Sequence, residues 1–188
     1  MTKTVGLHDI IFSSECHWGF GDEGQLYIAR KPGTADEPSN LQESRAPTKK
    51  QRKRVHGWAA IGYDFKSDLY LYDIATNGNG KMTQQVYLNN ILKPFIRELR
   101  NRGRYFVLEE DGDSGHGLGK NNPVRAWKEQ EGLEYYFNCS GSPDFAPIEN
   151  AWKVPKQYTR QYPHWDTDTL VKLVKEGWKE LKQETINR

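Results

Sequence analysis

The segment FVLEEDGDSGHG, residues 106–117, gathers side chains that could perform metal or proton chemistry. They are Glu109, Glu110, Asp111, Asp113 and His116. An apolar run leads into them, so they lie where a predicted strand ends, and strand ends are where α/β folds commonly bind ligands. Side chains alternate along a strand, which places Glu109 and Asp111 on one face and Glu110 on the other. Taken alone, the segment fits a cation site and a solvated, glycine-rich loop equally well.

A second candidate acid lies downstream. Mg²⁺ needs oxygen ligands that come from separate elements and converge on the ion. The segment SGSPDFAPIENAW, residues 140–152, places Glu149 in the first turn of a helix that we expect to begin at Pro147. The helix dipole alone favours an acid at this position. The pattern Ser-Pro-Asp followed by Pro-Ile-Glu-Asn is nevertheless more particular than a dipole preference requires.

The composition is that of an ordinary globular protein. The 188 residues are 28% charged and 12% aromatic, which fits one domain with a sizeable core. Cys16 and Cys139 lack the paired spacing of a structural zinc site, and we expect neither that site nor a disulfide framework. No stretch has the length of a signal peptide's apolar core or of a membrane span. We therefore expect an intracellular protein without a membrane partner.

Hydrophobic periodicity predicts a single, mixed α/β domain over residues 1–188. We expect strands at 9–13, 25–30, 55–63, 69–74, 104–110 and 133–138, and helices at 83–102, 122–132, 147–158 and from 166 onward. Residues 64–68 should form a turn. Pro94 should kink the first helix, and Pro155 should interrupt the third. Residues 31–54 are typical of a long exposed loop, and this loop ends in a basic run.

Two segments together resemble a known family. EEDGDSGHG followed by SPDFAPIENAW is similar to the catalytic core of the DDE superfamily of transposases, specifically the mariner-like group. In that group an aspartate at a strand end is followed five residues later by a histidine, as Asp111 is by His116. The group's third acid stands in a pattern that this chain matches through Glu149 and Trp152. The predicted strand VHGWAAIGY is similar to a strand of the family as well.

The resemblance covers residues 8–186 and implies a ribonuclease-H-like fold, a mixed sheet flanked by helices. Members of the family cut DNA phosphodiesters and join 3′ ends with two divalent ions, Mg²⁺ or Mn²⁺, held by three carboxylates. The first carboxylate lies on the first strand, the second after the fourth strand and the third on a helix. The resemblance assigns Asp111 to the second place and Glu149 to the third, as catalytic residues and metal ligands.

The position of the first carboxylate departs from the family pattern. There the family has an apolar strand followed by Ser/Thr-Asp-Glu, whereas this chain has FSSEC at residues 12–16, so Ser14 stands in place of the first aspartate. A neutral hydroxyl is a weak ligand for a hard dication, and we expect metal binding and catalysis to be impaired. Glu15 could substitute if a local twist turned it from the opposite strand face, and His17 could reach a metal.

Contacts with nucleic acid are expected from residues 45–54, which hold six basic residues and no acid. This run could neutralise phosphates, act as a nuclear import signal or be a solvated loop, and the sequence does not choose among the three. The candidate contacts, with the histidine of the acidic segment added, are Lys49, Lys50, Arg52, Lys53, Arg54 and His116.

The leading interpretation is a truncated, mariner-like DDE catalytic domain in the nucleus, weakened at Ser14, with DNA as its partner and a homodimer as a possible assembly. The chain begins at the first predicted strand, so we expect no helix-turn-helix module before the core. Two alternatives stay open. One is an active, metal-dependent nuclease in which another acid replaces the missing ligand. The other is a non-catalytic, domesticated module that binds nucleic acid or protein.

Overall fold

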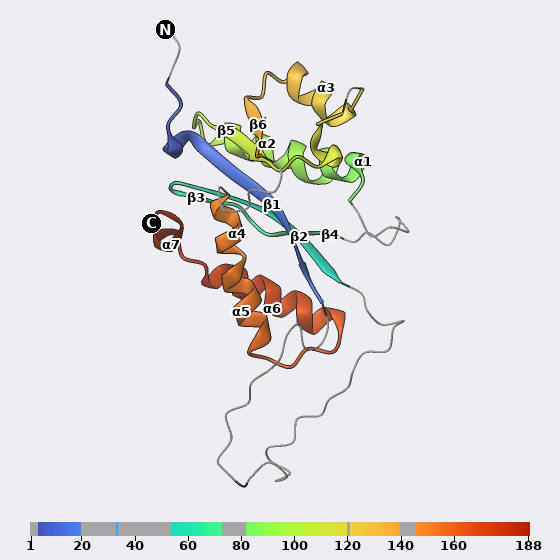
Figure 1. Cartoon of the computed structure of the whole chain (residues 1–188), viewed down its shortest axis with the longest axis vertical. Coiled ribbons are helices and arrows are strands. Elements are labelled where there is room, and N and C mark those ends of the chain that lie inside the picture. Colours follow the sequence, from blue (N-terminus) through green and yellow to red (C-terminus); the bar gives the residue numbers. More distant parts are fainter. Residues whose placement is uncertain (1–3, 20–32, 34–53, 73–81, 120, 140–145) are drawn as a thin grey trace.

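In the computed structural model of this chain, one sheet is flanked by helices (Figure 1). The structure describes residues 4–19, 33, 54–72, 82–119, 121–139 and 146–188. The expected strand at 25–30 lies outside these ranges. The strands are β1 (Ile10–Trp18), β2 (Val55–Gly62), β3 (Phe65–Lys66), β4 (Tyr70–Tyr72), β5 (Val107–Glu110) and β6 (Tyr135–Phe137).

The described helices alternate with the later strands and then gather at the C-terminal end. They are α1 (Gln84–Val86), α2 (Lys93–Asn101), α3 (Pro123–Gln130), α4 (Pro147–Ala151), α5 (Lys153–Arg160), α6 (Thr167–Glu180) and α7 (Gln183–Ile186). A π-helical stretch, Tyr87–Leu92, joins α1 to α2, and short 3₁₀ turns cover Leu7–Asp9 and Ser114–His116. None of the described helices is long and apolar enough to cross a membrane.

The sheet is mixed, with strand order β3-β2-β1-β5-β6 and with β4 also paired to β2. β1 runs antiparallel to β2 and parallel to β5, and β5 runs parallel to β6. β2 is buried along its whole length, which explains its continuous apolar sequence, because elements cover both of its faces. The predicted architecture, a mixed α/β sheet flanked by helices, is confirmed.

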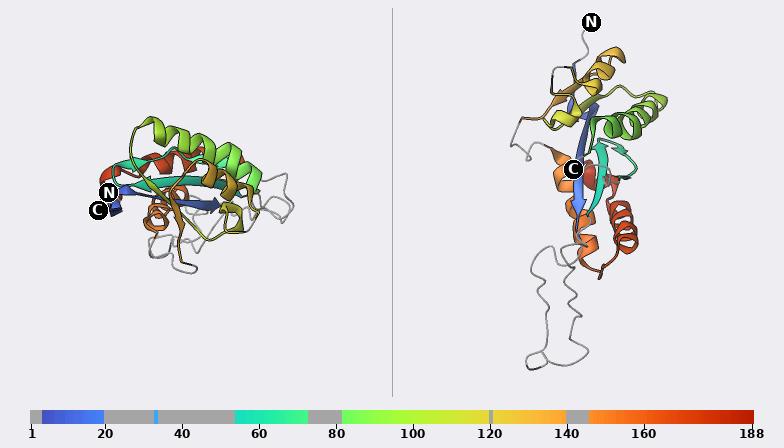
Figure 2. Two further views of the ribbon diagram at one scale, coloured as in Figure 1. Left: turned by 90° about the horizontal axis from the view of Figure 1, so that it is seen from above. Right: turned by 90° about the vertical axis from the view of Figure 1, so that its right-hand side faces the viewer.

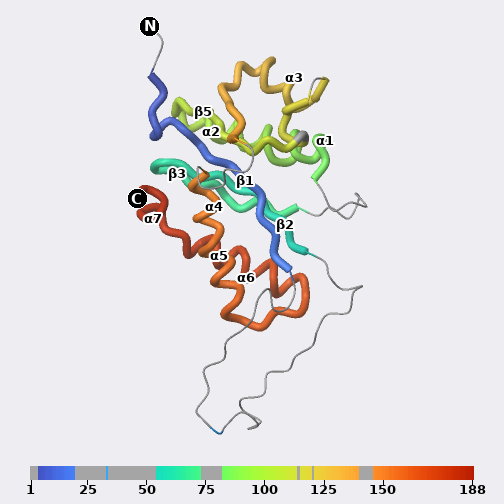
Figure 3. Tube along the Cα trace, in the orientation of Figure 1, coloured from blue at the N-terminus to red at the C-terminus, as the bar shows by residue number. Residues whose placement is uncertain are grey.

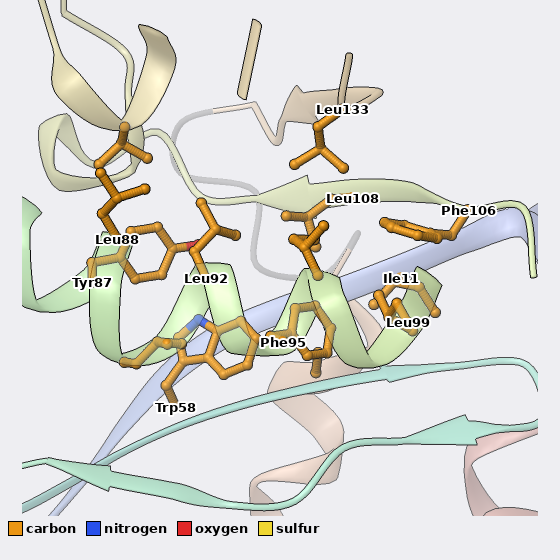
Figure 4. Close-up of a cluster of buried hydrophobic side chains, with 14 of the residues drawn as sticks. Ile11, Trp58, Tyr87, Leu88, Leu92, Phe95, Leu99, Phe106, Leu108 and Leu133 are labelled. Atoms are coloured by element: carbon orange, nitrogen blue, oxygen red, sulfur yellow. The ribbon is translucent and has the colours of Figure 1, made fainter. Parts of the chain in front are cut away.

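Alternation along β1 divides the core into two clusters. Ile11 faces α2, where the rings of Trp58 and Phe95 meet edge to face with centroids 4.9 Å apart (Figure 4). Phe12 faces the other layer, where Trp152 and Trp178 pack with ring centroids 5.0 Å apart. Figure 2 shows α2 and α4 on opposite sides of the sheet. Consequently the odd-numbered and even-numbered residues of β1 present two separate faces.

The helix expected at 83–102 contains a π-helical stretch where a kink at Pro94 was predicted. The irregularity is the π-helical stretch just before Lys93, whose N–H bonds to the carbonyl of Leu88, five residues back. Proline has no N–H and its ring presses on the carbonyl four residues earlier, so the preceding turn widens. Pro94 itself then fits the first turn of α2.

Two other expectations needed correction. The third helix breaks at Trp152, between α4 and α5, and Pro155 lies in the first turn of α5, where its missing N–H leaves no bond unmade. The expected turn at 64–68 contains β3, a short strand that pairs with the end of β2. Asp64 takes the positive φ of 52° that this tight reversal requires.

Candidate active site

Ser14 and Glu149 meet where β1 and α4 are in contact, and Figure 3 shows these two elements next to each other. Even-numbered residues of β1 face this helical layer, so Ser14 lies between Phe12 and Cys16 on the face that α4 covers. Ile148 is fully buried and anchors the helix, which leaves the exposed Glu149 above the strand. The Ser14 hydroxyl donates a 2.7 Å hydrogen bond to Oε1 of Glu149.

Asp111 reaches the same edge through the register of the sheet. In the parallel pair of β1 and β5, Phe12 lies opposite Glu109. Two residues further along each strand brings Asp111 level with Ser14, just past the end of β5. The Ser13 hydroxyl ties the two strands together with a 2.9 Å bond to the carbonyl of Glu109. Strand pairing therefore aligns the second candidate residue with the first.

The turn after Asp111 folds back so that His116 contacts its carboxylate. Nδ1 of His116 bonds to Asp111, and Nε2 lies 3.3 Å from Oε1 of Glu15. Burial by itself would lower the pKa of His116, but the carboxylates of Asp111 and Glu15 raise it to about 10, so the ring is an imidazolium at neutral pH. Partial burial would raise the pKa of Asp111, yet the bonds from His116 hold it below its usual range.

The other acids of the segment have structural partners. Glu110 is buried and accepts hydrogen bonds from the Lys128 ammonium and the Tyr87 hydroxyl. Glu109 accepts a 2.5 Å bond from Tyr136 on the neighbouring strand. Asp113 caps the following 3₁₀ turn by accepting a 2.7 Å bond from the N–H of Gly115.

Glu15 has partners on the other side of the strand from Ser14. It lies on the opposite face of β1 from Ser14, where Tyr72 donates a 2.8 Å hydrogen bond to its Oε2 and His116 lies beside its Oε1. His17 shares that face and pairs with His56. These contacts of both side chains therefore lie on the face of β1 opposite Ser14.

The donors present do not fit two divalent ions. Two anionic side chains, Asp111 and Glu149, and one neutral hydroxyl stand where three carboxylates would be needed. The Ser14 hydroxyl donates its hydrogen bond to Glu149. The imidazolium of His116 neutralises part of the negative charge on Asp111. Within the described ranges, no group of three or more His, Cys, Asp or Glu side chains is arranged to hold a metal.

A cation that sequence reasoning missed lies beside this site. Lys156 on α5 approaches the Cys16 thiol, two residues along β1 from Ser14. Lys153 and Arg160 follow the same flank of the helix, because positions three, four and seven apart share a face. The sequence signal that could have revealed these cations is their helical spacing in the segment that follows Glu149.

Of the predicted basic run, only Arg54 is described, and it is exposed. Lys49, Lys50, Arg52 and Lys53 lie outside the described residues.

We expect the Cys16 thiol to be inert in the native protein. Burial raises its pKa to about 11, and the nearby Lys156 offsets only part of that rise. At pH 8 the thiol therefore stays protonated and enclosed, whereas Cys139 is exposed. A disulfide reagent such as DTNB should titrate one thiol per native chain and two after unfolding in guanidinium. In Cys139→Ser, fast labelling of the native protein would contradict this environment for Cys16.

Comparisons with known proteins give structural matches alone: no family model and no curated protein matches the sequence. The Mos1 transposase paired-end complex with the left transposon end matches with a TM-score of 0.69 and 16% identity over 97% of this chain. The Mos1 mariner paired-end complex with Mn gives 0.70 and 16% over the same share. The chain spans about half of the transposase in each, 51% and 52%.

The structure of the Mos1 catalytic domain alone matches this chain as well. The Mos1 mariner transposase catalytic domain matches with a TM-score of 0.62 and 14% identity, covering 97% of this chain and 75% of that one. Structural matches at identities this low establish the fold of the chain. Its chemistry has to be argued from the residues of the site. The chain has the ribonuclease-H-like fold of the Mos1 mariner transposase catalytic domain.

Proposed function

We propose that this chain is a mariner-like, DDE-type transposase or endonuclease domain that binds DNA and has lost most or all of its metal-dependent cutting. The observation that carries the proposal is the 2.7 Å contact between Ser14 and Glu149. Two further observations support it: by the resemblance in sequence, Ser14 stands where the family has its first aspartate, and the fold matches that of the Mos1 catalytic domain. The strand register aligns Asp111 with that position.

Divalent ions such as Mg²⁺ or Mn²⁺, when bound in such a site, activate the attacking water and stabilise the leaving oxygen. Mos1 structures carry Mn or Mg, which supports these ions for the family fold. In this chain, Asp111 and Glu149 are the residues we assign as the remaining ligands. Loss of the first anionic ligand would weaken the binding of a hard cation by Asp111 and Glu149. The proposed loss of metal-dependent cutting follows from the missing negative charge at position 14.

DNA is the proposed partner, and the α5 flank supports it. Lys153, Lys156 and Arg160 form a row of cations that leads away from Glu149 along one side of the helix. Cations on such a row can neutralise consecutive phosphates and release their counterions. The basic run Lys49–Arg54 adds charge elsewhere in the chain and suits a nuclear location.

A second candidate function is a non-catalytic, domesticated module that binds nucleic acid or protein. It is favoured by one specific feature: a hydrophobic cluster packs on each face of the sheet, while the residue at the first acidic position of the family pattern is a neutral serine. The two proposals share DNA binding and differ in whether any metal-dependent cutting survives.

DNA binding should be weakened by removing the α5 cations together. In EDTA, fluorescence anisotropy with a duplex probe should show lower affinity for the triple variant Lys153→Ala, Lys156→Ala, Arg160→Ala. The slope of log affinity against log salt should become shallower by about 2–3, since each lost phosphate contact contributes about 0.9.

The matched control removes the same charge from α6. Lys172, Lys175 and Lys179 are exposed and have the same three-and-four spacing. Their triple alanine variant should keep the wild-type salt slope. Equal losses in the two triple variants would show that only net charge matters and would remove α5 from the proposed DNA surface. Absence of DNA binding by the wild-type chain would refute DNA as partner.

A further inference from the structure

Two histidines face each other on the neighbouring strands β1 and β2, on the face of the sheet opposite Ser14. His17 on β1 lies directly opposite His56 on β2 in the antiparallel register. Their Nδ1 atoms are 2.7 Å apart, and their ring centroids are 4.5 Å apart with the planes at 68°. His17 is exposed and His56 is largely buried. The pair therefore lies at the surface, and the surrounding residues hold the His56 ring in place.

A contact of 2.7 Å between two ring nitrogens requires one proton between them, because two lone pairs alone would repel. A transition-metal ion can replace that proton and accept both lone pairs. Two nitrogens bound to one tetrahedral Zn²⁺ at about 2.0–2.1 Å lie about 3.3 Å apart. The imidazoles would have to separate by about 0.6 Å, which small side-chain rotations on a rigid strand pair can provide.

The surroundings favour a cation. Glu15 lies two residues before His17 on the same face of β1, and Tyr72 lies opposite His56 in the register of β2 and β4. The ring of Tyr72 is 5.7 Å from that of His56, and its hydroxyl donates to Glu15. The carboxylate thus brings negative charge near the pair. Imidazole nitrogens select Zn²⁺, Cu²⁺ or Ni²⁺ over Mg²⁺, which prefers oxygen.

We propose that His17 and His56 form a cross-strand chelate for a divalent transition-metal ion such as Zn²⁺, with water completing its coordination. The ion would link the end of β1 to the start of β2 and hold the two strands together there. The site is separate from Ser14 and Glu149, because odd-numbered residues of β1 face the opposite side of the sheet. The proposal stands on its own geometry and does not depend on the function proposed for Ser14, Asp111 and Glu149.

Titration of the full chain with Zn²⁺ by calorimetry tests the proposal. We expect one ion per chain, with a dissociation constant of about micromolar order, and at least a tenfold weaker constant in His17→Ala and in His56→Gln, since even indirect partners of a ligand contribute 10–100-fold. Cu²⁺ bound to the wild type should show two nitrogen ligands by electron paramagnetic resonance. A large excess of Mg²⁺ should leave Zn²⁺ binding unchanged.

His164→Ala is the matched control, because His164 is a histidine elsewhere on the surface whose Nδ1 contacts the carbonyl of Tyr162. Its Zn²⁺ affinity should equal that of the wild type. His17 is exposed, so His17→Ala should keep the native circular dichroism spectrum and remain informative even if His56→Gln folds poorly. Wild-type affinity in His17→Ala, or no saturable binding by the wild type, would overturn the proposal.

Discussion

Ser14→Asp should make the stability of this protein depend on divalent metal. The Ser14 hydroxyl lies 2.7 Å from Oε1 of Glu149, so a carboxylate at position 14 would face another carboxylate at close range. Like charges at such a distance repel strongly unless a cation lies between them. Without metal, the variant should unfold at a lower temperature than the wild type. Mn²⁺ or Mg²⁺ should raise its Tm far more than that of the wild type, because binding to the folded state stabilises it.

The same variant should gain metal-dependent cutting of DNA, since it restores the third anionic ligand beside Asp111 and Glu149. Ser14→Asn is the matched control, because it adds a similar volume without charge. It should show neither the metal-dependent rise in Tm nor cleavage. If Ser14→Asp and Ser14→Asn respond to Mn²⁺ alike, the position does not form part of a metal site, and the assignment of Ser14 is wrong.

Lys128→Met should cost about 3–5 kcal/mol of unfolding free energy, the usual effect of removing one member of a buried ion pair. Lys128 and Glu110 are both almost completely buried, and the ammonium also donates a 2.6 Å bond to the carbonyl of His116. Burial lowers the pKa of Lys128, while the carboxylate of Glu110 opposes that shift. Methionine fills the space but removes the cation beside the buried Glu110 carboxyl group, to which the Tyr87 hydroxyl still donates a hydrogen bond. Urea denaturation measures the loss.

The double variant Glu110→Gln, Lys128→Met separates the charge from the packing. Removing both charges should recover much of the stability lost in Lys128→Met, because no uncompensated ion remains buried. A double variant as unstable as the single one would assign the loss to packing against Tyr135 and Phe137, whose rings lie 4.5 and 5.3 Å from the ammonium. A single variant as stable as the wild type would contradict the buried pair altogether.

The fold was predictable because its strands and helices carry strong local patterns. The apolar run at 55–63 predicted a strand, and the structure confirms it as β2. The capping side chains of Thr83, Asn122 and Asp166 mark the starts of their helices and accept the expected hydrogen bonds. The irregularities predicted at Pro94 and Pro155 occur a few residues earlier, before Lys93 and at Trp152, since proline excludes an N–H donor but does not fix which neighbouring turn adjusts.

The arrangement of the candidate site depends on contacts that no local pattern contains. Motif spacing selected Asp111 and Glu149, and strand alternation placed Glu15 on the face opposite Ser14, but the contacts of Glu15 with Tyr72 and His116 join segments far apart in the chain. Lys128 sits on a helix whose sequence suggests an exposed cation, and its burial follows from packing against Glu110. The pairing of His17 with His56 depends on a register between residues 39 apart in the chain.

The most direct test of the account is cleavage of DNA by the wild-type chain. A supercoiled plasmid should be incubated with the protein in Mg²⁺ and, separately, in Mn²⁺, with Asp111→Ala as the reference for background nicking. The account predicts that the wild type cuts no faster than Asp111→Ala in either metal, because Ser14 supplies no anionic ligand. Clear metal-dependent cutting that Asp111→Ala abolishes would contradict the claim that Ser14 has impaired the site.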